Sequence, residues 1–179
     1  ATDSVVVGVD VLDISVSEEG PEGLRLVNRG PEHFLQRELA PLTNRDVDRV
    51  EWRIRNIWKR AREVPRGFPV CSPPFSIAGV REVTLQLYPN GIEGKDNQDG
   101  YCGFYVWCPT GESLVMTLFV GEAKKGPIKT DFEGGAKGHP RFCKLVDQIP
   151  EGEEDLVVGL VAHKNPQLEE ESKLTELVL

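Results

Sequence analysis

From residue 50 onward, the sequence is a series of short segments rich in apolar and β-branched residues, and turns rich in proline and glycine separate these segments. In the first segment, at 50–55, apolar and charged residues alternate. Alternation with a period of two residues is typical of a β-strand that buries one face. Several short strands with turns between them and little helix predict an antiparallel β-sandwich or barrel. The expected strands span residues 50–58, 83–88, 101–107, 114–120 and 156–162.

The pattern divides the chain into three parts. Residues 1–49 are predicted as an N-terminal extension with candidate strands at 5–16 and 24–27 and a short helix at 33–39, which either adds to the sandwich edge or belongs to a neighbouring unit. Residues 50–163 form the expected sandwich, with a glycine- and lysine-rich loop after residue 120 and an apolar segment at 142–149. Residues 164–179 are predicted as a short helical tail, because Asn165 suits a helix cap and Pro166 the first helical position.

Charge and hydropathy argue against two classes of partner. The formal net charge is −8, whereas binding to nucleic acid depends on a positive field, so we expect no nucleic-acid partner. No apolar stretch reaches the length of a membrane span, so we expect no insertion into a membrane. The basic run within residues 49–66 is either a solvated edge or a surface for an acidic partner or membrane.

The cysteines and histidines do not follow the spacing of a zinc site. No C-x-x-C pair is present, and the three histidines stand at no ligand spacing, so the sequence predicts no metal and no other cofactor. Buried thiols are typical of a reducing compartment, and the chain begins without a basic, apolar leader, so a cytoplasmic location is expected. The four cysteines are Cys71, Cys102, Cys108 and Cys143.

The segment 101–107 places aromatic residues on both of its faces. Alternation predicts that Cys102, Phe104 and Val106 face the core, while Tyr101, Tyr105 and Trp107 share the outer face with Gly103 between them. The preceding strand would point Tyr88 outward near this row. An outer face is normally polar, so either the N-terminal extension or the C-terminal helix covers these rings, or they form a groove for a partner.

Several segments, in this order, resemble the meprin and TRAF homology (MATH or TRAF-C) domain over residues 50–162. The resemblance implies an antiparallel β-sandwich of seven to eight strands that binds an extended peptide of a partner protein, as part of a larger adaptor or scaffold protein. The segments are Val50-Glu51-Trp52-Arg53-Ile54-Arg55-Asn56, Cys71-Ser72-Pro73-Pro74-Phe75-Ser76-Ile77-Ala78-Gly79, Leu85-Gln86-Leu87-Tyr88-Pro89-Asn90-Gly91, Tyr101-Cys102-Gly103-Phe104-Tyr105-Val106 and Gly138-His139-Pro140-Arg141-Phe142-Cys143.

The resemblance also implies positions for a peptide groove. Gln86 and Tyr88 match two outward groove positions, and Gln86 departs from the arginine that is frequent there in receptor adaptors. Tyr105 matches an aromatic residue that holds an apolar peptide side chain, and Leu118 matches a further groove position. Lys137 and His139 replace an aromatic pair at the last wall. Together with the outer aromatic row, the predicted peptide-binding residues are Gln86, Tyr88, Tyr101, Tyr105, Trp107, Leu118, Lys137 and His139.

Two alternatives compete with a peptide-binding module. The first is a structural domain that uses its aromatic face to assemble, either with its own N-terminal arm or with another protomer as a homo-oligomer. The second is a Cys–His hydrolase built on Cys143 and His139, but no local family signature surrounds either residue, so we expect no enzyme activity. The loop at 95–100 fails as a calcium motif because Lys95 stands where the first carboxylate belongs.

Overall fold

A computed structural model describes residues 23–27, 48–94 and 100–163. Within these residues the protein is mostly β-structure with one short α-helix. The elements in chain order are β1 (Leu24–Val27), β2 (Arg49–Ile54), α1 (Ile57–Glu63), β3 (Val70–Cys71), β4 (Phe75–Ile77), β5 (Val80–Tyr88), β6 (Tyr101–Trp107), β7 (Ser113–Val120), β8 (Ala123–Asp131), β9 (Ala136–Lys144), the 3-10 helix η3 (Leu145–Asp147) and β10 (Leu156–His163).

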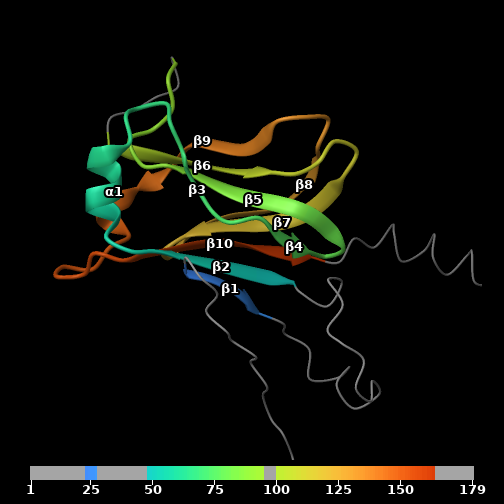
Figure 1. Cartoon of the computed structure of the whole chain (residues 1–179), viewed down its shortest axis with the longest axis horizontal. Helices are drawn as coiled ribbons and strands as arrows, with labels where there is room; N and C mark the ends of the chain where they lie inside the picture. The colour runs from blue at the N-terminus through green and yellow to red at the C-terminus, as the bar shows by residue number, and fades with distance from the viewer. Residues whose placement is uncertain (1–22, 28–47, 95–99, 164–179) are drawn as a thin grey trace, which may run out of the picture.

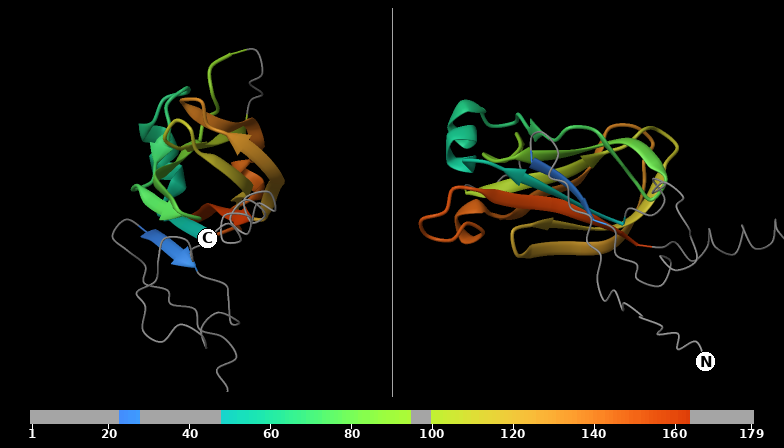
Figure 2. Two further views of the ribbon diagram at one scale, coloured as in Figure 1. Left: turned by 90° about the vertical axis from the view of Figure 1, so that its right-hand side faces the viewer. Right: turned by 60° about the horizontal axis from the view of Figure 1, so that its bottom comes forward.

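The strands form two antiparallel five-stranded sheets that pack face to face (Figure 1). One sheet, which we call the β10 sheet, has the strand order β1-β2-β10-β7-β8. The other, which we call the β6 sheet, has the order β3-β5-β6-β9, with β4 paired to β5. Figure 2 shows the same two layers from the end and from below. The prediction of an antiparallel two-sheet fold is confirmed, with ten strands in the described residues instead of seven to eight.

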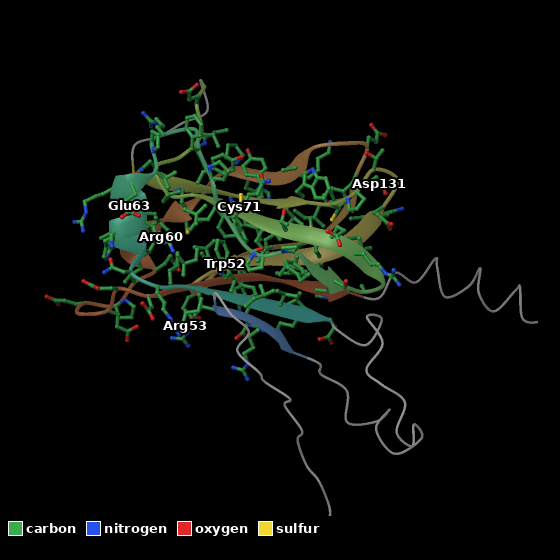
Figure 3. All side chains as sticks on the ribbon, in the orientation of Figure 1. Trp52, Arg53, Arg60, Glu63, Cys71 and Asp131 are labelled. Atoms are coloured by element: carbon green, nitrogen blue, oxygen red, sulfur yellow. The ribbon has the colours of Figure 1, made fainter. Side chains whose placement is uncertain are left out.

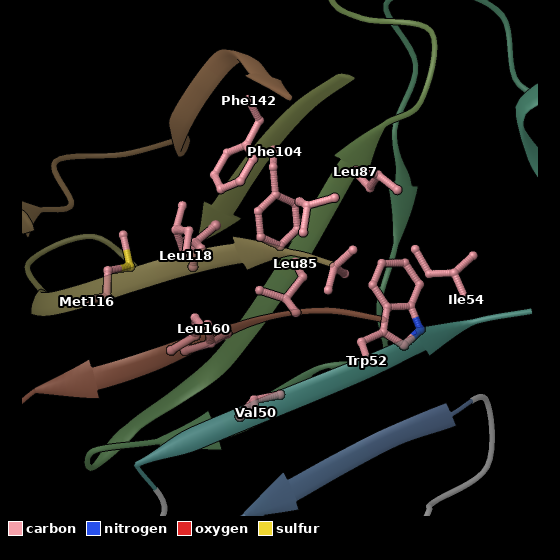
Figure 4. Packing of buried hydrophobic residues seen from close by; sticks show 14 of the residues in the cluster. Val50, Trp52, Ile54, Leu85, Leu87, Phe104, Met116, Leu118, Phe142 and Leu160 are labelled. Carbon is pink, nitrogen blue, oxygen red and sulfur yellow. The ribbon is translucent and has the colours of Figure 1, made fainter. Parts of the chain in front are cut away.

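A continuous apolar core lies between the two sheets. Each inner face follows the predicted alternation, so that Leu85, Phe104 and Leu160 are fully buried while their strand neighbours point outward. The ring of Phe104 meets the ring of Phe142 edge to face, with 5.6 Å between their centroids (Figure 4). Burial of such side chains is the main favourable contribution to folding, at about 1.5–3 kcal/mol for each large residue.

Helix α1 replaces the second half of the strand predicted at 50–58. Asn56 adopts a left-handed backbone conformation, with φ of 46°, which asparagine tolerates better than most residues and which ends the extended chain. Its side-chain oxygen then accepts a hydrogen bond from the amide of Lys59 at 3.0 Å and caps the helix. Trp58 therefore belongs to a helix at one end of the sandwich, near the labelled Arg60 and Glu63 (Figure 3).

The prediction of a loop after residue 120 is wrong, because β8 and most of β9 occupy this region. Both are the outermost strands of their sheets, and each pairs with one neighbour in the part of the chain that the structure describes. Edge strands commonly carry lysine, proline and glycine, which weaken a strand pattern read along the sequence. In β8 these residues are Lys124, Lys125, Gly126, Pro127 and Lys129.

Part of the N-terminal extension joins the sandwich. The candidate strand at 24–27 is confirmed as β1, which pairs antiparallel with β2 at the edge of the β10 sheet. The predictions for residues 5–16, 33–39 and 164–179 lie outside the described residues. In the described part of the chain, no helix is both long and apolar enough to cross a membrane.

Candidate functional site

The outer face of the β6 sheet carries most of the aromatic side chains predicted to be functional. Cross-strand partners point to the same face of a sheet. Cys71 of β3 pairs with Gln86 of β5, Gln86 pairs with Tyr105 of β6, and Tyr105 pairs with Gly138 of β9. This register row therefore crosses the whole sheet, beginning at the exposed Cys71 (Figure 3).

Tyr88 and Tyr105 form the centre of this face. Their ring centroids lie 5.4 Å apart and the ring planes are inclined by 71°, an edge-to-face arrangement that aromatic pairs prefer. The Tyr88 hydroxyl donates a long hydrogen bond of 3.4 Å to Oε1 of Gln86. Partial burial raises the pKa of Tyr88, and the nearby Cys71 raises it further. The two rings are thus held side by side while both remain partly exposed.

Two glycines leave the surface beside Tyr105 without side chains. A β-carbon at Gly103 would lie 3.3 Å from Cγ2 of Ile92 and 3.4 Å from Cε2 of Tyr105, so the tyrosine ring lies over this glycine. A β-carbon at Gly138 would collide with the backbone of Phe104 and Tyr105, so β9 approaches β6 too closely for any other residue. Tyr105 therefore stands beside bare backbone on the edge strand.

Trp107 and Tyr101 extend the aromatic row to both ends of β6. Trp107 is 36% exposed, and its register partners, Thr84 and Ala136, have small side chains. At the other end Tyr101 pairs with Lys144, whose Nζ lies 5.8 Å from the centroid of the tyrosine ring. The face thus offers aromatic surface along the length of one strand.

Three of the predicted groove residues do not join this face. Leu118 is only 3% exposed and lies in the core, where it pairs with Leu160, so its prediction as a groove position is wrong. Lys137 and His139 pair with Val106 and Phe104, whose side chains point into the core, so both belong to the opposite face of β9 from Tyr105.

His139 lies at the side of the sandwich where β9 approaches β8. Its ring centroid is 5.9 Å from that of Phe142. Burial lowers the pKa of His139, and the ammonium group of Lys125 on β8 lowers it further. Lys125 also donates a hydrogen bond of 2.9 Å to the carbonyl oxygen of Arg141. Both effects favour the neutral form of the His139 imidazole, whose ring packs near Phe142 and not beside the tyrosines.

The structure brings together Gln86, Tyr88, Tyr101, Tyr105 and Trp107 as predicted, and it adds neighbours that the sequence did not indicate. Cys71 lies in β3, whose two residues are too few to give a strand pattern in the sequence. Gly138 lies in the region predicted as a loop, and Ile92 follows a turn. A signal for Gly138 was the segment Gly138-His139-Pro140, since glycine and proline together are typical of an edge strand with close backbone approach.

Cys143, which the sequence paired with His139 as a candidate catalytic residue, lies against a second thiol. Cys143 contacts Cys102, with 3.7 Å between the sulfur atoms, and desolvation together with this hydrogen bond raises the pKa of Cys143. Within residues 23–27, 48–94 and 100–163, no group of three or more His, Cys, Asp or Glu side chains is arranged to hold a metal ion. The acidic turn before β10 instead supports α1, because Asp155 and Glu154 accept hydrogen bonds from Asn56.

Comparison with known proteins adds no identity to these observations. No protein-family model matches the chain. No curated protein matches it either.

Proposed function

We propose that this protein is a peptide-recognition module of the meprin and TRAF homology type, and that the outer face of the β6 sheet binds an extended segment of a partner protein. The observation that carries the proposal is the partly exposed pair Tyr88 and Tyr105, which lies beside the exposed backbone of Gly138. Tyrosine suits this role because it offers a large contact area, a hydrogen-bonding tip and few torsions to restrict on binding.

The edge strand β9 supplies the second part of the proposed site. Within the described residues β9 pairs with β6 alone, so its other edge carries backbone groups that a peptide strand could meet. Addition of a strand to a sheet edge is a common mode of peptide recognition, in which backbone hydrogen bonds give affinity and side-chain pockets give specificity. Gly138 would let the peptide approach Tyr105 without a side chain between them.

The described part of the N-terminal extension supports an open face. β1 pairs with β2 in the β10 sheet, on the opposite layer from the tyrosines (Figure 1). The alternative, in which the extension covers the aromatic row, would require residues outside β1. Partly exposed aromatic residues gathered on one face of a sheet are the kind of surface that marks a partner site. The proposal assigns the protein binding without catalysis, within a larger adaptor or scaffold.

Selection from a random peptide library tests this proposal. The wild-type chain should enrich peptides that share a motif, and Tyr88→Ala/Tyr105→Ala should lose at least about tenfold in affinity for them, since two aromatic anchors are removed. Ile128→Ala is the matched control, because it removes an exposed apolar side chain, 44% exposed, from β8 of the other sheet. Equal retention of the peptides by the double variant and by wild type would contradict the proposed groove.

Sedimentation of the same three proteins separates the assembly alternative. A module with a free groove should give the same mass for wild type and for the double variant. A wild-type oligomer that dissociates in Tyr88→Ala/Tyr105→Ala but not in Ile128→Ala would instead assign the aromatic face to assembly between copies of the chain.

A further inference from the structure

Two buried thiols connect β6 to the edge strand β9. Cys102 and Cys143 are direct register partners, and their sulfur atoms lie 3.7 Å apart. Cys102 is fully buried, and Cys143 is 8% exposed near the end of the edge strand. Of the other two cysteines, Cys71 is exposed on the outer face, and Cys108 is buried just after the end of β6.

The backbone geometry at this pair suits a covalent link. Directly opposed residues of antiparallel strands have Cα atoms about 4.5–5.5 Å apart, which falls within the range of about 4.4–6.8 Å that a disulfide spans. The sulfur atoms would have to approach from 3.7 Å to about 2 Å. A register shift between Cys102 and Phe104 interrupts the ladder on one side of the pair, so β9 is less constrained there.

The electrostatic surroundings make the two thiols unequal. The hydrogen bond from Cys143 lowers the pKa of Cys102, burial opposes this effect, and the ammonium group of Lys125 adds a smaller lowering. The hydrogen bond with Cys102, and then desolvation, raise the pKa of Cys143. Cys108 is in a different environment, because burial and then the carboxylate of Glu112 raise its pKa to about 12. A thiolate is the reactive form of cysteine, and the hydrogen bond between the two sulfurs lets one of them carry the proton while the other is the thiolate.

We propose that Cys102 and Cys143 are a redox-active dithiol that a hydroperoxide oxidises to a cross-strand disulfide. The thiolate of the pair attacks the peroxide, an S–O bond forms, the O–O bond breaks, and the departing alkoxide or hydroxide takes a proton from solvent. The sulfur of the other thiol then attacks the sulfur of the sulfenic acid, and the S–O bond breaks. The hydroxide leaves as water with the proton of that thiol. Two electrons pass from the thiols to the peroxide.

Mass spectrometry of the full chain after treatment with hydrogen peroxide tests this proposal. We expect the intact mass to fall by two hydrogen atoms and two of the four cysteines to escape alkylation in denaturant. Digestion without reductant by chymotrypsin, which cleaves after aromatic residues, should release a linked pair of peptides that contain Cys102 and Cys143 but not Cys108. Dithiothreitol should reverse the change, and the oxidised protein should melt about 5 °C or more above the reduced one.

Cys108→Ser is the matched control, since it removes a buried thiol from the same strand region without touching the pair. It should form the same link, whereas Cys143→Ser should form none. Full alkylation of all four cysteines after peroxide treatment of the folded wild type would overturn the proposal, and so would oxidation of Cys143 to the sulfinic acid without a cross-link. Because the wild-type peptide map decides between these outcomes, a poorly folded variant does not affect the test. The proposal stands or falls independently of peptide binding.

Discussion

Each of the two sheets places an aromatic ring over a glycine on its outer face, and the two rings differ in how deeply they are buried. In the β10 sheet, Phe119 pairs with Gly159, and a β-carbon at this glycine would meet the phenylalanine ring. Phe119 is only 3% exposed, although it points away from the core. The guanidinium carbon of Arg49 lies 4.5 Å above the ring centroid, and Glu51 holds Arg49 in place through an ion pair of 2.7 Å.

In the β6 sheet, the corresponding ring is less deeply buried. Tyr105 lies over Gly103 and beside Tyr88, and both tyrosines remain partly exposed. An outer aromatic ring can thus be fully covered in this fold, as that of Phe119 is. The partly exposed tyrosine pair is therefore the better candidate for contact with a partner.

The largest expected difference between the two faces is the cost of removing each ring. Phe119→Ala should lower the free energy of unfolding by about 3–5 kcal/mol, because it removes a fully buried aromatic side chain. Tyr105→Ala should cost about 1–2 kcal/mol, because the tyrosine already shares its surface with water. Urea denaturation of both variants measures the difference. A greater loss for Tyr105→Ala would break the comparison and give that residue a structural role.

The glycines beneath the rings should differ in the same direction. Gly159→Ala should destabilise the protein by about 2–3 kcal/mol, because the new methyl group meets both the Phe119 ring and the carbonyl oxygen of Val50. Gly103→Ala should cost less than about 1 kcal/mol, because its neighbours lie 3.3 Å or more away and the Tyr105 ring can shift into solvent. Thermal unfolding compares the two, and equal costs would show that the Tyr105 ring is held as firmly as that of Phe119.

The cover over Phe119 should make a smaller and salt-dependent contribution. Arg49→Gln removes both the ion pair with Glu51 and the contact with the ring. We expect a loss of about 1 kcal/mol in low salt and less in high salt, since screening weakens the ion pair in the wild type. Unfolding curves at two ionic strengths measure this change. A loss that does not vary with salt would assign the whole contribution of Arg49 to packing.

The smallest expected effect is in the titration of the open face. The folded state raises the pKa of Tyr88 above 10.0 through burial, so the native protein keeps this proton at a pH where the unfolded chain has begun to lose it. The native state then binds more protons than the unfolded state, and stability falls as pH rises from about 10 toward the folded pKa. Ultraviolet titration should show a late ionisation that disappears in Tyr88→Phe and moves to lower pH in Cys71→Ser. An unchanged tyrosine titration in Cys71→Ser would contradict the contribution of the thiol.

The sequence predicted those parts of the site that depend on neighbouring residues along one strand. Alternation within 101–107 was enough to separate Phe104 from Tyr105, because burial of one face dictates which residues are apolar. Leu118 lies in phase with Leu114 and Met116 along β7, and all three are buried. The groove position assigned to Leu118 came from resemblance to a family, and the core packing of this strand contradicts it.

The parts that could not be predicted depend on contacts between distant residues. Helix α1 has only seven residues, and its cap residue Asn56 is held by Glu154 and Asp155, almost one hundred positions further along the chain. Isolated helices of this length are marginal in water, so the local pattern carries little signal. β9 was missed because its glycine and proline serve a close approach to β6, which a linear pattern does not report.

The pairing of β2 with β10 has a consequence for how the chain folds as it is synthesised. The four strands of the β6 sheet's main ladder all lie between residues 70 and 144, whereas the β10 sheet joins residues 49–54 to residues 156–163. A ribosome therefore releases every strand of the first sheet before the central strand of the second exists. Until β10 emerges, β2 and β7 lack the strand that lies between them. Closing the sandwich is therefore a late, long-range step. Such steps are slow, and apolar strands remain exposed to misassembly in the interval.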